Sequence, residues 1–170
     1  MNQLVNRMLR AARLDVSLYE EAERDKQLFK QSMLVVIISS AAAGIGAISQ
    51  GGLNGIIVGT AFALVSWFIW AYLTYIIGTK LLPTANTQAD YGQLLRTIGF
   101  SSSPGVIRVL GIIPGLSALV FIIAGIWMLI AMVIAVRQAL DYDSTLRAVG
   151  VCVIGWIIQA VIVSLTVAVM

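Results

Sequence analysis

The sequence predicts an all-α polytopic membrane bundle of five transmembrane helices with an N-terminal amphipathic cytoplasmic helix. Three observations lead to this prediction. The 170 residues are 59% hydrophobic, more than a water-soluble domain usually carries. Six of the eleven Lys and Arg residues and five of the eight Asp and Glu residues lie in the first 32 positions. After them, long apolar runs alternate with short polar connections, which is typical of spans joined by loops.

The chain has room for one membrane domain and one short extension. A helix needs about 20 residues to cross the hydrocarbon core of a bilayer. We therefore expect residues 1–32 to form a charged helical extension and residues 33–170 to form the membrane domain. The five expected spans cover residues 33–49, 53–77, 94–113, 116–136 and 148–169.

In the extension, apolar residues recur at steps of three and four through residues 2–19, which predicts one amphipathic helix. Residues 20–30 carry charges of both signs at helical contact spacing, which predicts an exposed continuation. The apolar face could lie on lipid headgroups or pack on the protein's own bundle. We expect a surface that docks on the membrane or on a partner, built from Arg7, Arg10, Arg13, Tyr19, Glu20 and Glu21.

The loop charges predict the orientation of the chain. If the chain crosses five times, the connections on the N-terminal side hold Lys80, Arg96, Arg137 and Arg147. The turns at residues 50–55 and 114–117 hold no Lys or Arg. Because basic loops stay in the cytoplasm, we expect a cytoplasmic N-terminus. Four crossings would lose this agreement.

The third expected span contains a helix breaker and polar residues. Pro104 removes one backbone donor, so we expect a broken helix buried among its neighbours. An ionisable residue at membrane depth is a functional candidate, although Arg108 could also snorkel or make a structural hydrogen bond. The candidate intramembrane polar site comprises Ser101, Ser102, Ser103, Pro104 and Arg108.

Small residues gather in the first two expected spans, where they allow helix backbones to approach closely. The glycines expected at helix contacts are Gly44, Gly46, Gly55 and Gly59. These contacts could join the protein to another membrane protein, to a second copy of itself, or only to its own helices.

The composition argues against catalysis and against cofactors. The chain has no histidine and one cysteine, Cys152, so it lacks the residues of most metal and haem sites and of nucleophilic catalytic sets. We expect no enzyme activity, no cofactor and no bound metal. Basic residues lie beside membrane segments rather than along a groove, which favours the lipid bilayer over nucleic acid as their partner.

Three stretches of the chain resemble prokaryotic Yip1-domain proteins. They are residues 13–22 (RLDVSLYEEA), residues 99–104 (GFSSSP), similar to a glycine-aromatic-x-x-x-proline element, and residues 125–140 (GIWMLIAMVIAVRQAL), similar to the family's fourth helix. The likeness covers residues 12–165. The resemblance implies a five-helix bundle with a cytoplasmic N-terminus and, because these members are prokaryotic, a place in a bacterial inner membrane. Eukaryotic members associate with Rab GTPases, but this chain has no match to their Asp-Leu-Tyr-Gly-Pro element.

The sequence favours a non-enzymatic membrane scaffold or accessory subunit that associates with other membrane proteins or organises lipid. The small-residue helix faces and the charged extension support this interpretation. The alternative is a small transporter or channel that uses the broken third helix around Pro104 and Arg108.

Overall fold

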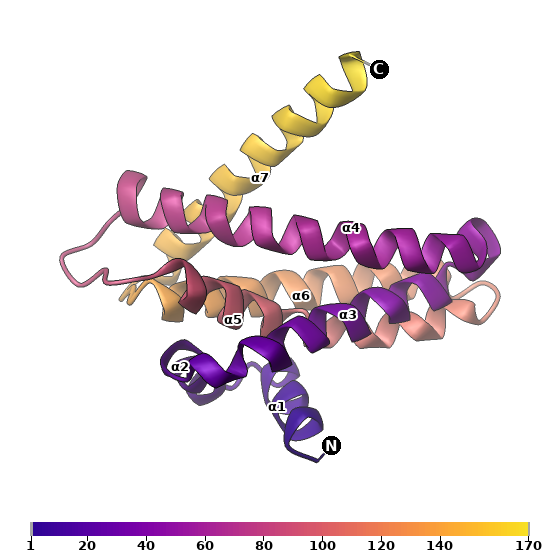
Figure 1. Ribbon diagram of the computed structural model, residues 1–170, viewed down its shortest axis with the longest axis horizontal. Coiled ribbons are helices and arrows are strands. Elements are labelled where there is room, and N and C mark those ends of the chain that lie inside the picture. The colour runs from indigo at the N-terminus through magenta and orange to yellow at the C-terminus, as the bar shows by residue number, and fades with distance from the viewer. Residues whose placement is uncertain (1, 170) are drawn as a thin grey trace.

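The computed structural model describes the backbone of residues 2–169 and the side chains of residues 3–48, 52–159 and 161. Within residues 2–169 the regular elements are helices (Figure 1). In chain order they are α1 (Asn2–Ala12), α2 (Val16–Arg24), η1 (Lys26–Leu28), α3 (Phe29–Gly46), α4 (Ile48–Ile76), η2 (Ile77–Leu81), α5 (Tyr91–Ser101), η3 (Ser103–Ile112), α6 (Ser117–Ala139) and α7 (Thr145–Val169).

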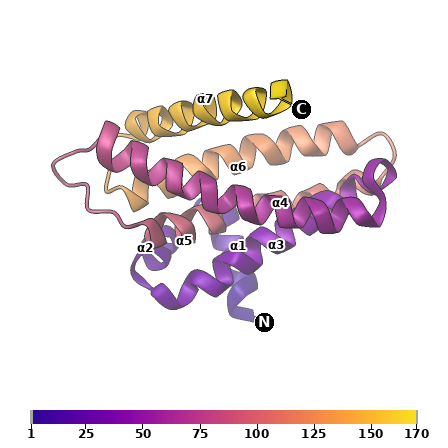
Figure 2. The ribbon, with the colours of Figure 1, turned by 45° about the horizontal axis from the view of Figure 1, so that its top comes forward.

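Three helical stretches of the described chain are long and apolar enough to cross a membrane. They are Lys26–Gly46, Gly52–Leu81 and Ser117–Ala139. In Figures 1 and 2, α3, α4 and α6 run along the long axis of the molecule. Thr145–Gln159 is a shorter apolar stretch. The chain is therefore an all-helical membrane protein, and the number of five crossings stays a prediction.

The predicted single helix over residues 2–19 is wrong, because the chain turns between α1 and α2. Leu14 adopts a φ of 63°, which an α-helix does not allow. The Asp15 carboxylate then caps α2, since its Oδ1 accepts a hydrogen bond from the Ser17 N–H at 3.0 Å. The extension is consequently a pair of short helices rather than one rod.

The predicted turn at residues 50–55 overlaps the observed one, which begins earlier, after Gly46. The helix α3 ends at Gly46, and α4 starts at Ile48 with a kink at Gly52, whose φ is 57°. Residues 53–55 already belong to the straight part of α4. Glycine adopts this positive φ without steric strain, which explains the position of the kink.

The expected third span is broken as predicted. The helix α5 starts three residues before the predicted boundary, because Asp90 and Gln93 form a capping box around its first turn. It ends at Ser101, and the chain continues as the 3₁₀ helix η3 with Pro104 in its first turn. Proline lacks the N–H that an α-helix interior would need.

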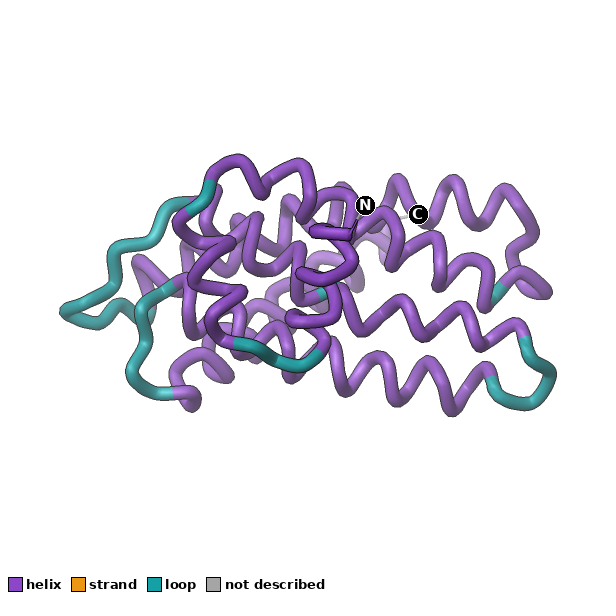
Figure 3. The backbone as a smooth tube through the Cα atoms, turned by 90° about the horizontal axis from the view of Figure 1, so that it is seen from below, coloured by secondary structure: helices purple, strands orange, loops and turns teal. Residues whose placement is uncertain are grey.

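The connections between the long helices lie at the two ends of the bundle (Figure 3). At one end, the Tyr142 hydroxyl donates to the carbonyl oxygens of Gly78 and Leu82 at 3.1 and 2.7 Å. At the other end, Gly111 of η3 packs against the backbone of Gly46. The loop residues 82–90 and 140–144 therefore lie together, opposite the α3–α4 connection.

Two clusters of buried side chains hold the molecule together. The larger fills the bundle between α3, α4, α5, α6 and α7, and includes Trp67 and Trp70, which are 5% and 6% exposed. The smaller joins the extension to the bundle. Its members are Ala11, Leu18, Tyr19, Ala22, Leu28, Val35, Phe100 and Ala135. Burial of these apolar side chains attaches α1 and α2 to α3, α5 and α6.

Candidate functional site

Arg108 lies inside the helix bundle and joins η3 to α3. Its Nε donates to the Gly105 carbonyl oxygen at 3.0 Å. Its Nη2 donates to the Ser39 carbonyl oxygen at 3.1 Å and to Ser39 Oγ at 2.8 Å. The sequence left three roles open for Arg108: a functional site, snorkelling to the interface, or a structural hydrogen bond. The structure shows hydrogen bonds within the bundle.

Gly105 makes room for this arrangement. A Cβ at this position would overlap Ser39 Oγ and would lie 2.7 Å from both Arg108 Nη2 and Met128 Sδ. The absence of a side chain at residue 105 therefore allows the guanidinium group to reach α3. Gly46 has a similar role at the end of α3, because a Cβ there would overlap the Arg108 carbonyl oxygen.

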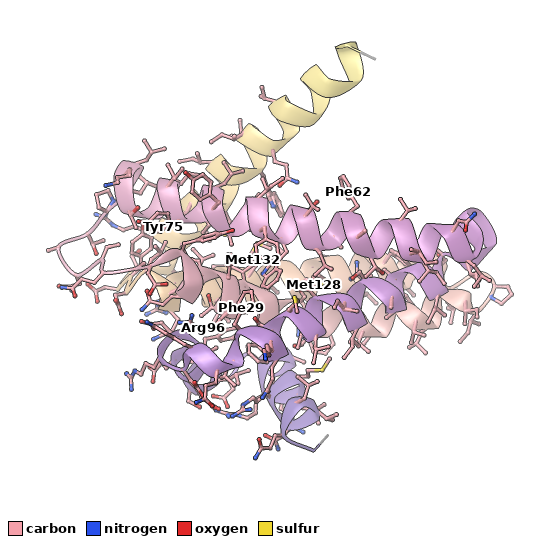
Figure 4. All side chains as sticks on the ribbon, in the orientation of Figure 1. Phe29, Phe62, Tyr75, Arg96, Met128 and Met132 are labelled. Atoms are coloured by element: carbon pink, nitrogen blue, oxygen red, sulfur yellow. The ribbon has the colours of Figure 1, made fainter. Side chains whose placement is uncertain are left out.

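A cavity of about 500 Å³, here named the Arg108 groove, lies beside these residues. Figure 4 shows two of its lining side chains, Met128 and Met132, between the ribbons of α3 and α4. The lining residues come from α3, α4, α5, η3 and α6. They are Val36, Ser39, Ser40, Ala43, Gly44, Ala47, Gly55, Gly59, Ala63, Ser66, Trp67, Trp70, Ile98, Ser102, Arg108, Phe121, Met128 and Met132.

The structure brings only part of the predicted polar site together. Ser102 and Arg108 line the Arg108 groove. Ser101 and Ser103 are buried, and their hydroxyls donate to carbonyl oxygens three residues earlier, each at 2.7 Å. Pro104 is buried at the start of η3. These last three residues shape the helix break and do not reach the groove.

The four predicted contact glycines fall into two pairs. A Cβ on Gly44 would lie 2.9 Å from the Ile56 side chain, and a Cβ on Gly46 would overlap η3. This pair therefore packs the protein's own helices. Gly55 and Gly59 have nothing within 4 Å of an added Cβ, and both line the Arg108 groove.

Several charged residues of the predicted docking surface bind one another. Arg7 Nη2 lies 2.7 Å from Glu21 Oε1, and Arg10 Nη1 lies 2.7 Å from Glu21 Oε2. Arg10 Nε also contacts Asp15 Oδ2 at 2.8 Å. Hydrogen bonds from Ser17 and Arg10 lower the pKa of Asp15. Burial alone would raise the pKa of Glu21, but the hydrogen bonds from Arg10 and Arg7 lower it.

The other members of that surface differ in exposure. Tyr19 is fully buried, and its hydroxyl donates to the Ala11 carbonyl oxygen at 3.3 Å. Burial raises the pKa of this phenol. Glu20 accepts a hydrogen bond from Gln138 at 3.2 Å, whereas Arg13 is exposed. Docking on a membrane or a partner through this surface stays a prediction.

Two anchoring residues escaped the sequence interpretation. Arg96 is 4% exposed, and its Nε donates to the Ala22 carbonyl oxygen at 2.6 Å, while its Nη2 donates to the Glu23 carbonyl oxygen. Trp127 Nε1 of α6 donates to the Ala12 carbonyl oxygen at 2.7 Å. Arg96, labelled in Figure 4, lies where α5 passes the extension. No periodicity in the sequence marks either contact, since each joins residues more than 70 positions apart.

A second cavity of about 600 Å³, here named the α6 groove, lies where the extension meets the bundle. Its apolar lining comes mainly from α6, with Val16 from α2 and Val149 from α7. Val16 and Ile130 are 45% and 44% exposed. The lining residues are Val16, Leu129, Ile130, Val133, Ile134, Arg137, Gln138, Thr145 and Val149.

The side chains that the structure describes include no group of three or more Cys, Asp or Glu residues placed to hold a metal ion. The polar side chains that line the Arg108 groove are the Arg108 guanidinium and the hydroxyls of Ser39, Ser40, Ser66 and Ser102, together with the indole N–H groups of Trp67 and Trp70. Chemically, the two grooves can bind an apolar group, and the Arg108 groove can in addition bind an anion.

The fold and these grooves define a class of protein: an all-helical membrane bundle with a pair of charged helices docked on one side. The chain belongs to the Yip1 domain family, because the family model matches residues 19–166. The match confirms the resemblance found in the sequence, and it reaches from α2 into α7. Comparisons with curated proteins and with solved structures found no match.

Proposed function

We propose that this protein is a non-enzymatic integral membrane scaffold or accessory subunit that binds another membrane protein through the α6 groove. The observation that supports this proposal is the apolar, exposed lining of that groove at the junction of extension and bundle. Exposed apolar surface of this kind, bordered by polar residues, marks interaction sites. The polar border here consists of Arg137, Gln138 and Thr145.

The position of the α6 groove gives the partner contact with both parts of the chain. Val16 belongs to the extension, Ile130 to the membrane domain, and Val149 to α7. A helix about 10 Å wide that occupied the groove would touch all three segments. The α6 groove therefore suits a helix of another membrane protein or of a second copy.

Photo-crosslinking in native membranes tests this proposal. A photo-crosslinking amino acid at Ile130 is expected to give one discrete protein adduct. The matched control position is Phe62, which is 70% exposed and points away from the bundle in Figure 4. It is expected to give lipid adducts only, because an exposed apolar side chain of a membrane helix faces acyl chains.

A second variant separates a specific partner from chance proximity. The captured protein should co-purify with the unmodified chain in mild detergent and should be lost with Ile130→Arg, since a charge in the groove would lie unpaired against the partner. An adduct of twice the chain's mass identifies the partner as a second copy. Equal lipid adducts from both positions would contradict the scaffold proposal.

Transport through the Arg108 groove is the alternative function, supported by a guanidinium that lines a mainly apolar cavity of the bundle. Trp67 and Trp70 line the groove; they are buried, and their indole N–H groups donate to the Leu95 carbonyl oxygen and to Met132 Sδ. A flux assay in proteoliposomes comparing the wild-type chain with Arg108→Ala tests this alternative. Background flux from both proteins excludes it.

A further inference from the structure

The Arg108 groove is elongated along α4. Its α4 lining residues recur at steps of three and four, at Gly55, Gly59, Ala63, Ser66 and Trp70. Fifteen residues of helix correspond to about 22 Å. This length exceeds half of the hydrocarbon core, which is about 15 Å. A single acyl chain that lies parallel to α4 would follow the groove along its length.

The walls of the groove suit an acyl chain. Gly55 and Gly59 are exposed and leave space where side chains would otherwise stand. Across from them, Met128 and Met132 of α6 contribute flexible thioether side chains, which adapt to an irregular apolar guest. Trp67 and Trp70 form the far end of the groove.

Arg108 leaves a positive charge uncompensated in the bundle. Its hydrogen-bond acceptors are neutral, and within the described residues these bonds use Nε and Nη2 and leave Nη1 for a ligand. The sequence has no Asp or Glu between Asp25 and Asp90, or between Asp90 and Asp141. Because an unpaired cation at membrane depth is unfavourable, a bound anion would stabilise this site.

The position of Arg108 along the bundle places that anion near one end. Arg108 is four residues from the end of η3 at Ile112, which corresponds to about 8 Å in a 3₁₀ helix. Its carbonyl group packs on Gly46, the last residue of α3. This end is opposite the loops at residues 82–90 and 140–144. A headgroup phosphate could therefore reach Arg108 while its acyl chain extends toward Trp70.

We infer that the Arg108 groove binds one anionic phospholipid, with the phosphate on Arg108 and one acyl chain along α4. Arginine pairs strongly with phosphate through charge-assisted hydrogen bonds. Charge complementarity favours an anionic lipid over a second helix of apolar residues, which would leave the guanidinium unpaired. This inference does not depend on the α6 groove, so the two proposals can fail separately.

Native mass spectrometry of the detergent-purified, full-length protein tests the inference. The protein is delipidated and then exposed to equimolar phosphatidylglycerol and phosphatidylcholine with the same acyl chains. Retention of phosphatidylglycerol should exceed that of phosphatidylcholine by about tenfold, because the choline ammonium of phosphatidylcholine offsets the phosphate charge and would lie close to the Arg108 guanidinium. Arg108→Gln should reduce this ratio to near one, whereas Arg147→Gln, at an exposed position in the first turn of α7, should leave it unchanged.

A second pair of variants tests the acyl-chain part of the groove. Nothing lies within 4 Å of a Cβ atom added at Gly59, so the fold should tolerate Gly59→Phe, which places a ring in the groove. It should lower retention of both lipids about equally. Ile57 is on the same helix, and its side chain is 70% exposed. The Ile57→Phe variant should retain both lipids as the wild type does. These variants decide the question if Arg108→Gln does not fold.

Other outcomes overturn the inference. Equal retention of the two lipids by the wild type would exclude recognition of a headgroup with net negative charge. If oleate displaces phosphatidylglycerol at equal concentration, the occupant is a free fatty acid rather than a phospholipid. Unchanged retention in Gly59→Phe would show that bound lipid lies outside the groove.

Discussion

Two buried arginines connect distant parts of the chain in different ways. Arg96 donates to the Ala22 and Glu23 carbonyl oxygens in the last turn of α2. Carbonyls at a helix C-terminus lack intrahelical partners and carry partial negative charge, so they compensate this guanidinium. Arg108 donates to Ser39 in the interior of α3 and to Gly105, where no helix end adds negative charge. Arg96 therefore has the electrostatic partner that Arg108 lacks.

At the residue scale, Arg96→Met should loosen the extension. The substitution leaves two carbonyl oxygens unsatisfied at a buried contact, which should lower the free energy of unfolding by about 1–3 kcal/mol. Thermal unfolding in detergent measures the loss, and trypsin cleavage after Arg24 or Lys26 should become faster. Arg147→Met is the control, because Arg147 is exposed in the described structure. Equal behaviour of the two variants would contradict the anchoring role of Arg96.

At the element scale, glycines determine how closely α3 and η3 approach. Gly46 and Gly111 face each other at one end, and Gly105 meets Ser39 further along. Small residues on both helices replace side-chain packing with backbone contact. This close approach allows a 3₁₀ segment with a buried proline to lie among regular helices.

Gly46→Ala should be destabilising while Gly59→Ala should not. The added methyl at residue 46 would overlap the Arg108 carbonyl oxygen, and overpacking of this kind costs about 1–3 kcal/mol. At residue 59 the methyl meets open space, and alanine favours a helix over glycine by about 1 kcal/mol. Melting temperatures in one detergent compare the two variants. A stable Gly46→Ala protein would mean that α3 and η3 do not pack as described.

The sequence predicted elements better than contacts. Apolar runs marked the long helices, and Pro104 marked the break in the third segment, because both depend on local composition. The turn at Leu14 was missed, since leucine rarely adopts a positive φ. Asp15 could have indicated this turn, because aspartate favours the N-cap of a helix and here interrupts the apolar face.

The candidate site was only partly predictable. Gly44 and Gly46 look the same in sequence as Gly55 and Gly59, yet the first pair is filled by neighbours and the second is open. The difference depends on which helix lies opposite, and periodicity carries no such information. Arg108 stood out because it lies between apolar residues in the second half of the expected third span, but its Ser39 partner lies 69 residues away.

At the scale of the whole molecule, the distribution of charge separates its two ends. Lys80, Arg137 and Arg147 lie at or beside the loops of residues 82–90 and 140–144. The turn between η3 and α6 has no basic residue. On the positive-inside rule, we propose that the loop-rich basic end faces the cytoplasm together with the extension.

Cysteine labelling of intact and inverted membrane vesicles tests this orientation. In a Cys152→Ala background, a membrane-impermeant maleimide should label Arg13→Cys only from the cytoplasmic face. It should label Pro114→Cys only from the opposite face. Both positions are exposed, and the native cysteine is buried, so the background is low. The reverse pattern would contradict the proposed orientation, and labelling of both positions from one face would contradict an odd number of crossings between them.

The hydrogen bond between Trp127 and Ala12 has a consequence for biosynthesis. Residue 12 leaves the ribosome early, but its donor lies 115 residues later in the chain. The surface that receives α1 and α2 also needs Phe100 and Ala135. During synthesis the extension must therefore remain undocked until α6 has entered the membrane, and its attachment is among the last steps of assembly. For that interval, α1 and α2 are available to any factor that recognises nascent chains.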